Sequence, residues 1–386
     1  MNSEHGITTH GRPNVSKAKG DRSVHKLHRR RGNRAAAVSF TLIGAAAALL
    51  SACGSSTGTS ASATTSSTAP TATSTVLLQV YPGTIVNLVT YVAQQEGFFA
   101  KNGIKAVLVP INSSPAGAAA LAGGSINILS ASPDAILPFV QKGLPVEVFA
   151  GQTKQIFELI VNNSVQSSAP YPQSIKALAG KKIGVTALGS AGQALMEAML
   201  GNAGLSPSAV TFVAVGGPAT GLAAVENGLV SADLLYDPTP TAAVLSGKAH
   251  ILVDLRKGEG PPSIANTDYV GEWATKSYIA GHPKVISGLR RAFAEADVWM
   301  HESANLSAVE QIYSSVVGVA VPQNDLAAFT KANLPIATAA YSATSLNAWN
   351  QFDTKYHFLT QPLSLSNIYS AGTPASEAAV RSLAGS

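Results

Sequence analysis

Cysteine and charge are both scarce in this chain of 386 residues. Cys53 is the only cysteine, so no disulfide can form within the chain, and 12% of the residues are charged. Residues 1–52 hold nine of the 26 Lys and Arg and two of the 21 Asp and Glu, which leaves 17 basic and 19 acidic residues after them. Nucleic-acid binders usually carry a concentrated basic face. We therefore do not expect a nucleic acid as a partner.

One apolar run near the amino end indicates export. Ala35–Leu50 contains no charge and follows the basic stretch Lys26–Arg31. The run is short for a span of the ~30 Å hydrocarbon core, whereas a basic segment before such a run is typical of a signal peptide. We interpret residues 1–52 as a signal peptide that uses the general secretory route.

The segment around the cysteine predicts a lipid anchor. Leu50-Ser51-Ala52-Cys53-Gly54 resembles the lipobox of bacterial lipoproteins, in which a diacylglycerol is attached to the cysteine. Acylation of Cys53 would also remove the only reactive thiol of an exported chain. The alternative is a cysteine buried in a transmembrane helix. Residues 53–75 are rich in Ser, Thr, Ala and Gly, a composition that does not fold, and we predict a tether there.

After residue 75, short apolar runs alternate with segments of helical period. This pattern is typical of α/β domains, and it predicts largely parallel sheets. Helices are expected over 85–99, ending near Gly97, and over 116–122. From about residue 280 the period is helical, with Trp299 and Trp349 expected in the core. The strand candidates are Val76–Tyr81, Ala106–Ile111, Ile126–Ser130, Val146–Ala150, Leu159–Asn162, Lys182–Thr186, Thr211–Val215, Ala232–Tyr236 and Ile251–Asp254.

Two stretches of the chain look alike. Ala119–Ile128 and Ala223–Asp233 each contain the end of a helix, a glycine stop and the beginning of a strand. The similarity favours two related lobes. We predict one lobe over 76–169 and 251–386, and the other over 170–250.

Five segments form an ordered pattern along the chain: Tyr91–Phe99 with Asn102–Ile104, Ala120–Ile128, Lys142–Val146, Ile175–Val185 with Gly189–Ala191, and Asp237-Pro238. In this order they resemble one family, the nitrate/sulfonate/taurine-type (NMT1/THI5-like) solute-binding lipoproteins of ABC transporters. One departure is Asn127, which stands where that family usually has Asp. The similarity implies a type II periplasmic-binding-protein fold, in which two α/β lobes joined by two crossover segments close on a small-molecule solute. It also implies a monomer that works with permease and ATPase subunits.

A rule for open α/β sheets selects the candidate site. Ligands bind beyond the carboxyl ends of strands, where helix amino termini present free amides. Four segments meet this rule, and each also has a structural alternative: the hydroxyl residues could cap helices, and Asp237 could hold a hinge. Asp134 is better explained as a carboxylate of an early helical turn. The predicted ligand-binding residues are Tyr81, Thr84, Asn87, Ser132, Ser190 and Asp237.

The chemistry of these segments bears on the solute. They contain no Arg, and Lys154 is the nearest basic candidate. Helix amides alone can hold a sulfonate or nitrate, but the absence favours a neutral or partly cationic solute, such as an aromatic heterocycle stacked on Tyr81 or Tyr236. A precursor of the thiamine pyrimidine is one such heterocycle. A lipoprotein that senses its solute for a membrane partner is the alternative to delivery.

Catalysis is not expected. The enzymatic relatives that make the thiamine pyrimidine need a cysteine-rich motif, and here the one cysteine is assigned to the anchor. The Gly-x-Ser-x-Gly spacing of a nucleophile elbow is not met at 189–192. The histidines after the tether lie too far apart in sequence to predict a metal pair or a triad. We therefore expect no metal, no cofactor and no enzyme; these histidines are His250, His282, His301 and His357.

Overall fold

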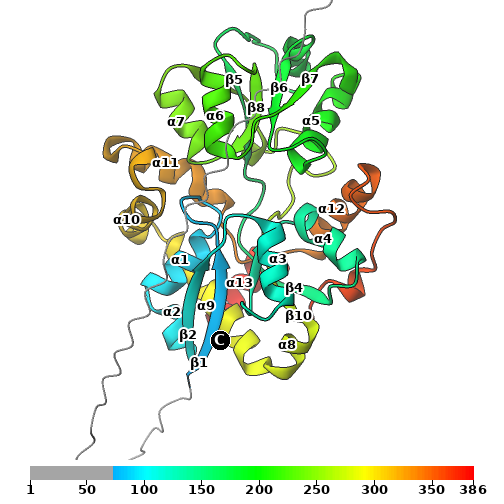
Figure 1. The fold of residues 1–386 in the computed structure, drawn as a ribbon. Helices are drawn as coiled ribbons and strands as arrows, with labels where there is room; N and C mark the ends of the chain where they lie inside the picture. Colours follow the sequence, from blue (N-terminus) through cyan, green and yellow to red (C-terminus); the bar gives the residue numbers. More distant parts are fainter. Residues whose placement is uncertain (1–72) are drawn as a thin grey trace, which may run out of the picture. The chain divides into compact units, whose positions relative to one another are not determined.

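The computed structural model describes residues 73–386, which form the strands β1–β10 and the helices α1–α13 (Figure 1). The predicted signal peptide, Cys53 and nearly all of the tether lie outside the described residues. None of the helices within residues 73–386 combines the length and the apolar character that crossing a membrane requires.

The first group of strands contains β1 to β4 and β10. Strands β1 and β2 are parallel, and β10 lies between β3 and β4 and is antiparallel to both. A bridge between Leu78 and Ile128 connects β1 to the residues just before β3. The bounds are β1 (Ser74–Val80), β2 (Ile104–Pro110), β3 (Leu129–Ala131), β4 (Val146–Gly151) and β10 (Gly271–Thr275).

The second group is a five-stranded sheet with the order β7-β6-β8-β5-β9. Strands β6, β7 and β8 are parallel, whereas β5 is antiparallel to both of its neighbours. Helices α6 and α7 are on one side of this sheet and α5 is on the other (Figure 1). The bounds are β5 (Phe157–Asn162), β6 (Lys182–Val185), β7 (Thr211–Ala214), β8 (Ala232–Tyr236) and β9 (Ala249–Asp254).

Two features of the sheets differ from the sequence analysis. The expectation of largely parallel sheets is wrong, because β5 and β10 both run antiparallel to their neighbours. Strand β5 was also placed within a lobe ending at residue 169, yet it is hydrogen-bonded between β8 and β9. If the lobes follow the sheets, the second lobe spans 157–254 rather than 170–250, and the division stays a prediction.

Glycines set the ends of several helices. The helix predicted over 85–99 is interrupted at Gly97, whose φ of 76° lies in the left-handed region, so it forms α1 (Leu88–Gln95) and α2 (Phe98–Lys101). The two similar stretches do contain the predicted glycine stops, since Gly124 and Gly228 have φ values of 73° and 70° after α3 (Ser114–Ala122) and α6 (Pro218–Glu226).

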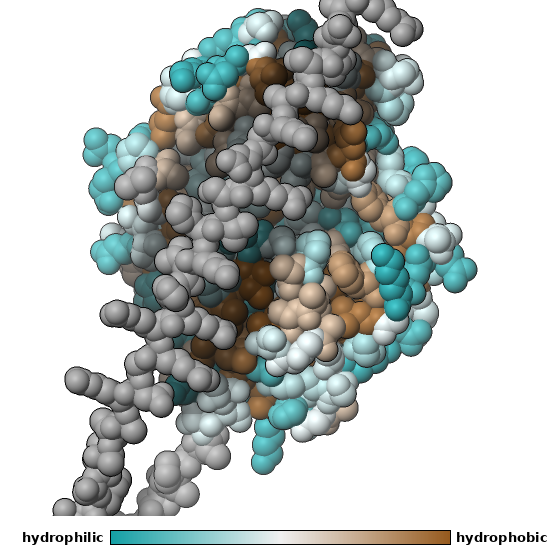
Figure 2. All heavy atoms as spheres, in the orientation of Figure 1, coloured by the Kyte–Doolittle hydropathy of each residue, from teal (hydrophilic) through white to brown (hydrophobic). Residues whose placement is uncertain are grey.

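The carboxyl-terminal part is helical, as predicted, and it covers the first group of strands. Helix α9 packs against α1, α2 and α13. Trp349 is fully buried, whereas Trp299 is half-buried. In Figure 2 hydrophilic residues gather along the edges of the face in view. The remaining bounds are α4 (Pro133–Gln141), α5 (Ala191–Asn202), α7 (Thr239–Leu245), α8 (Lys276–Gly281), α9 (Pro283–Met300), α10 (Leu306–Val317), α11 (Leu326–Asn333), α12 (Ala343–Lys355) and α13 (Glu377–Ala384).

Two segments carry the chain between the sheets, and they are paired with each other. Residues 152–156 lead from β4 to β5, and residues 255–270 lead from β9 to β10. Gln152 N and Thr153 N donate to Val270 O, and Tyr269 N donates to Thr153 O. A third segment, residues 334–339, lies alongside, because Lys154 N donates to Ile336 O and Thr338 N donates to Gln152 O. We call this three-segment arrangement the joint.

Candidate functional site

The loop 81–87, which follows β1, is closed by its own side chains. Asn87 is fully buried, and its Oδ1 accepts a hydrogen bond from Tyr81 N at 2.9 Å. Thr84 Oγ1 donates to Tyr81 O at 3.1 Å and accepts from Val86 N at 3.3 Å. The hydroxyls of Tyr81 and Ser114, at the start of α3, are 2.7 Å apart. Asn87 and Thr84 therefore shape the loop, and Tyr81 remains the residue of this loop with a ring available to a solute.

Ser132 and Asp134 lie at the amino end of α4. Ser132 makes no cap bond to the backbone, and its hydroxyl is instead hydrogen-bonded to the side chains of Asp134 and Tyr269. Burial raises the pKa of Asp134, and burial together with Asp134 raises the pKa of Asp353 on α12 well above its ordinary value. Both carboxyl oxygens of Asp353 are buried without a partner among the described residues. At least one of the two acids is therefore expected to stay protonated, because two buried negative charges would be unfavourable.

Ser190 stands at the amino end of α5, at the cap position that the sequence predicts. Its side chain makes no cap bond, and its Oγ is buried without a hydrogen-bond partner among the described residues. Gly189 precedes it with a φ of 77°, and Gly189 N donates to Gln193 Oε1 at 2.9 Å. A buried hydroxyl without a partner is costly, which makes Ser190 Oγ a group that a solute could satisfy.

Tyr236 ends β8 and belongs to a row of aromatic rings. Its ring centroid is 5.9 Å from that of Phe157, which is 5.5 Å from that of Tyr269. Burial raises the pKa of Tyr81, and Tyr236, which belongs to a different sheet, adds to this rise. The edge-to-face contacts are a favourable aromatic geometry, and they make this row a candidate for stacking with a planar solute.

Asp237 is placed differently from the other predicted residues. It is fully buried, and its Oδ2 accepts from Arg256 Nη1 at 2.8 Å and from Asn333 Nδ2 at 2.7 Å. Its Oδ1 accepts from Thr241 N at 2.9 Å. These contacts occupy both oxygens, and they favour the alternative in which Asp237 supports a hinge.

The structure thus brings together Tyr81, Ser132 and Tyr236, with Asp134 and Tyr269 beside them, whereas Asp237 faces Arg256. Lys154, the nearest basic candidate, has its Nζ 3.0 Å from Glu377 Oε1 on α13. Sequence reasoning missed Tyr269, because it lies in a segment between strands, and Ser114, because the helix was expected to begin later, at 116. The start of α3 carries a cap signal, since Ser113 Oγ accepts from Ala116 N at 3.4 Å.

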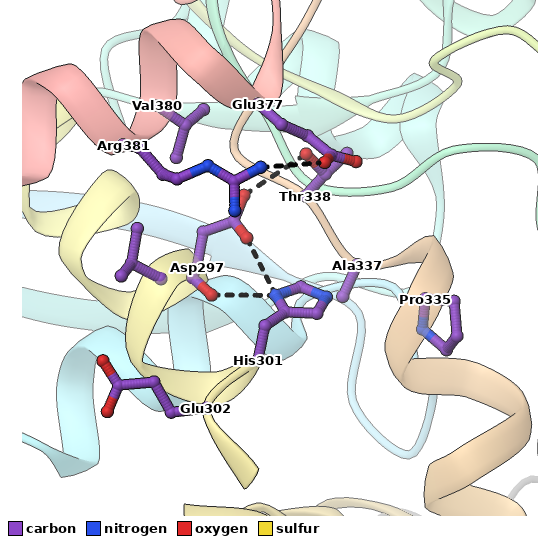
Figure 3. Close-up of a pocket in the computed structure, with 10 residues that line it drawn as sticks. Asp297, His301, Glu302, Pro335, Ala337, Thr338, Glu377, Val380 and Arg381 are labelled. Carbon is purple, nitrogen blue, oxygen red and sulfur yellow. Dashed lines mark hydrogen bonds and ion pairs between the residues drawn. The ribbon is translucent and has the colours of Figure 1, made fainter.

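A cavity of about 280 Å³ lies elsewhere, between α9, α13 and residues 335–338 (Figure 3). His301 points at Asp297, with Nδ1 3.0 Å from Asp297 Oδ1 and its Nε2 3.2 Å from Leu334 O. Asp297 Oδ2 accepts from Ala339 N at 2.6 Å. Because Leu334 and Ala339 bound the third segment of the joint, this cavity concerns the joint, and none of the predicted site residues lines it.

His301 predicts a small dependence of stability on pH. Burial alone would lower the pKa of His301, but hydrogen bonds to Asp297 and to Leu334 O raise it above its ordinary 6.5. Its contribution is complete below pH 6.5 and is lost as pH rises through the raised pKa. In thermal unfolding, His301→Gln is expected to lower the free energy of unfolding more at pH 5.5 than at pH 8.5. The difference should be under about 1 kcal/mol, because the His301 side chain is 38% exposed and solvent screens the pair. An equal loss of stability at both pH values would mean that protonated His301 does not stabilise the folded protein.

Comparisons with known proteins agree with this architecture. A family model described as NMT1/THI5 like matches residues 86–304. The periplasmic aliphatic sulphonate binding protein SsuA from Escherichia coli is 19% identical, with a TM-score of 0.61 over 77% of this chain and 92% of that chain. The periplasmic nitrate-binding protein NrtA from Synechocystis PCC 6803 is 16% identical, with a TM-score of 0.62 over 81% of this chain and 89% of that chain.

The fold also occurs in an enzyme. The desulfurization enzyme DSZB is 15% identical, with a TM-score of 0.56 over 81% of this chain and 99% of that chain. No curated protein sequence matches this chain. The similar structures show the type II periplasmic-binding-protein fold that the sequence resemblance implied.

Proposed function

Because the chain belongs to the NMT1/THI5-like family, we propose that it is the extracytoplasmic solute-binding component of an ABC importer and takes a small organic solute between its two lobes. The observation that supports this most is the joint. Two groups of strands connected by paired segments are suited to hinge closure, and Tyr81 and Tyr236 belong to different groups.

We propose further that the protein is a monomer held at the outer face of the membrane through lipidated Cys53, and that permease and ATPase subunits are its partners. The lipobox supports the anchor. Delivery of the solute is proposed over sensing because the structural neighbours SsuA and NrtA are described as binding proteins. Binding without catalysis is part of the same proposal.

The proposed solute is neutral or partly cationic, with an aromatic ring as the favoured form. The nearby cations are already paired, Lys154 with Glu377 and Arg256 with three carboxylates. Sulfonates and nitrate stay in the test because helix amides alone can bind them.

A thermal-shift screen of the purified protein tests the proposal. The panel is sulfonates, taurine, nitrate, aminopyrimidines, flavins and aromatic acids. A ligand at 100 times its dissociation constant stabilises the folded state by about 2.7 kcal/mol, so a binder gives a clear rise in melting temperature. A rise with one class supports a binding function and identifies the charge of the solute that the pocket accepts. No rise with any class counts against the proposed solutes.

Site variants then test the placement of the pocket. Ser190→Ala is expected to weaken binding of the solute found in the screen by about 5- to 30-fold, since it removes one hydrogen bond worth about 1–2 kcal/mol. Tyr81→Leu is expected to weaken binding by a similar factor, since it removes the ring on which the solute would stack. Ser382→Ala, an exposed serine on α13, is the control and should bind like wild type. Isothermal titration calorimetry measures all three. Unchanged affinity in both site variants would mean that the pocket lies elsewhere.

A further inference from the structure

Glu272 is the centre of a buried polar cluster beneath the loop 81–87. It is the second residue of β10 and is fully buried. Ser130 Oγ donates to Glu272 Oε1 at 2.8 Å, and Asn87 Nδ2 donates to Ser130 Oγ at 2.7 Å. Because Asn87 also binds Tyr81 N, three hydrogen bonds in series connect Glu272 to the first residue of the loop.

The other side of the cluster is part of the joint. The side chain of Gln152 is hydrogen-bonded to Glu272, and its Nε2 also donates to Thr90 Oγ1 on α1 at 2.9 Å. The backbone of Gln152 pairs with Val270 and with Thr338. Glu272 therefore contacts both the loop of the candidate site and the segment about which the lobes would move.

Two acceptor atoms of the cluster have no hydrogen-bond donor. Glu272 Oε2 and Gln152 Oε1 are both buried acceptors without a partner among the described residues. Leaving such atoms unpaired is costly, and a proton on Glu272 supplies a donor within the cluster. Burial raises the pKa of Glu272 to about 8, although hydrogen bonds from Ser130 and Gln152 lower it in part.

No cation among the described residues contributes to the pKa of Glu272. Neither β3 nor α3 carries a titratable residue. On β4, Glu147 is 3.9 Å from Lys276 of α8, which pairs those two with each other. Arg290 of α9 donates to Phe149 O on β4 and to Ser370 Oγ. The pKa of Tyr81 is raised by burial and, to a smaller extent, by Glu272.

We propose that Glu272, as a neutral carboxylic acid, is a positioning residue that holds the loop 81–87 on Gln152 of the joint. The proposal rests on the proposed function, since it assigns Glu272 to the support of that same site. When the lobes move about the joint, the cluster transmits the position of Gln152 to Tyr81, which we placed at the solute.

Glu272→Gln tests the effect of the proton on Glu272, because glutamine has nearly the same shape and supplies an N–H donor at every pH. An acid with a raised pKa contributes stability that is complete below its ordinary pKa of 4.5 and is lost as pH rises through about 8. Relative to the variant, the folding equilibrium constant of wild type should therefore fall by about tenfold per pH unit between pH 5 and 8 and stay level above that. Urea unfolding across pH 5 to 9.5 measures it, with Glu147→Gln as a control that should run parallel to wild type.

Parallel pH profiles of wild type and Glu272→Gln would overturn the proposal. If the variant does not fold, carbon-13 NMR of wild-type protein labelled at the glutamate carboxyls replaces it, and the absence of a resonance titrating near pH 8 would overturn the proposal equally. These measurements use no solute, so their failure is distinct from failure of the proposed function.

Hydrogen exchange tests the positioning role separately. Gln152→Leu removes the partner on the joint, and we expect the Tyr81 amide, which Asn87 holds, to exchange at least about tenfold faster. Glu272→Gln should keep the wild-type rate and so act as the rescue by a conservative change. An unchanged rate in Gln152→Leu would show that the cluster does not position the loop.

Discussion

Arg256→Met is expected to lower the free energy of unfolding by about 3–5 kcal/mol, because it leaves buried carboxyl groups without their counter-charge. The Arg256 side chain is 7% exposed. It donates through Nη2 to Glu158, through Nη1 to Asp237 and through Nε to Asp254. Burial raises the pKa of Glu158 to about 9, and Asp254 keeps Lys257, whose Nζ lies 3.1 Å from its Oδ2, so Asp237 is the partner that loses its cation. Urea unfolding at pH 7 measures the loss.

A second arginine provides the control. Arg381 on α13 is 70% exposed, with Nη2 3.6 Å from Glu377 Oε2, and Arg381→Met should change stability by no more than about 0.5 kcal/mol. Arg256→Lys should recover little, since one ammonium cannot donate to three carboxyl groups in the directions of a guanidinium. Similar losses in the two methionine variants would mean that the Arg256 site is hydrated and its charges are screened.

Gly151→Ala is expected to destabilise the protein by about 3 kcal/mol or more. Gly151 is the last residue of β4 and precedes the joint. A Cβ there would lie 2.0 Å from Ala340 O and 2.9 Å from Thr338 O. Both are backbone atoms that are held by other segments, so the added methyl group forces main-chain displacement instead of a side-chain rotation. Thermal and urea unfolding measure the loss.

Gly201→Ala is the matched control for this prediction. The position lies in α5, and nothing approaches within 4 Å of the Cβ that alanine would add. The same chemical change should stabilise the protein by about 0.5–1 kcal/mol, because alanine restricts the unfolded chain and favours the helix. If Gly151→Ala were as stable as Gly201→Ala, residues 338–340 would not be packed on β4 as closely as the structure has them.

Much of the fold could be predicted from local patterns. Each of the nine strand candidates overlaps a strand, because apolar runs and glycine stops are signals that a few neighbouring residues provide. The strand that was missed is β10, Gly271–Thr275. A short segment that contains Glu272 does not resemble a buried strand, and the reason that it is one lies in partners far along the chain, Ser130 and Gln152.

The candidate site could be predicted in part, because the ends of strands and the starts of helices are visible in the sequence. What each side chain contacts was not visible. Asp237 and Ser190 looked equally available, yet Arg256 and Asn333 bind the first and nothing among the described residues binds the second. Arg256 is 19 residues from Asp237 and 98 from Glu158, and no spacing rule covers such a contact.

The joint has a mechanical consequence. Two connecting segments that lie side by side can bend and can also twist about their common axis. Here residues 334–339 are attached to Gln152 and Lys154 by backbone hydrogen bonds, and Ala339 is attached to Asp297 of α9. These bonds brace the connecting segments from the side, so we expect torsion to be resisted more than bending and the lobes to approach each other by one main rotation.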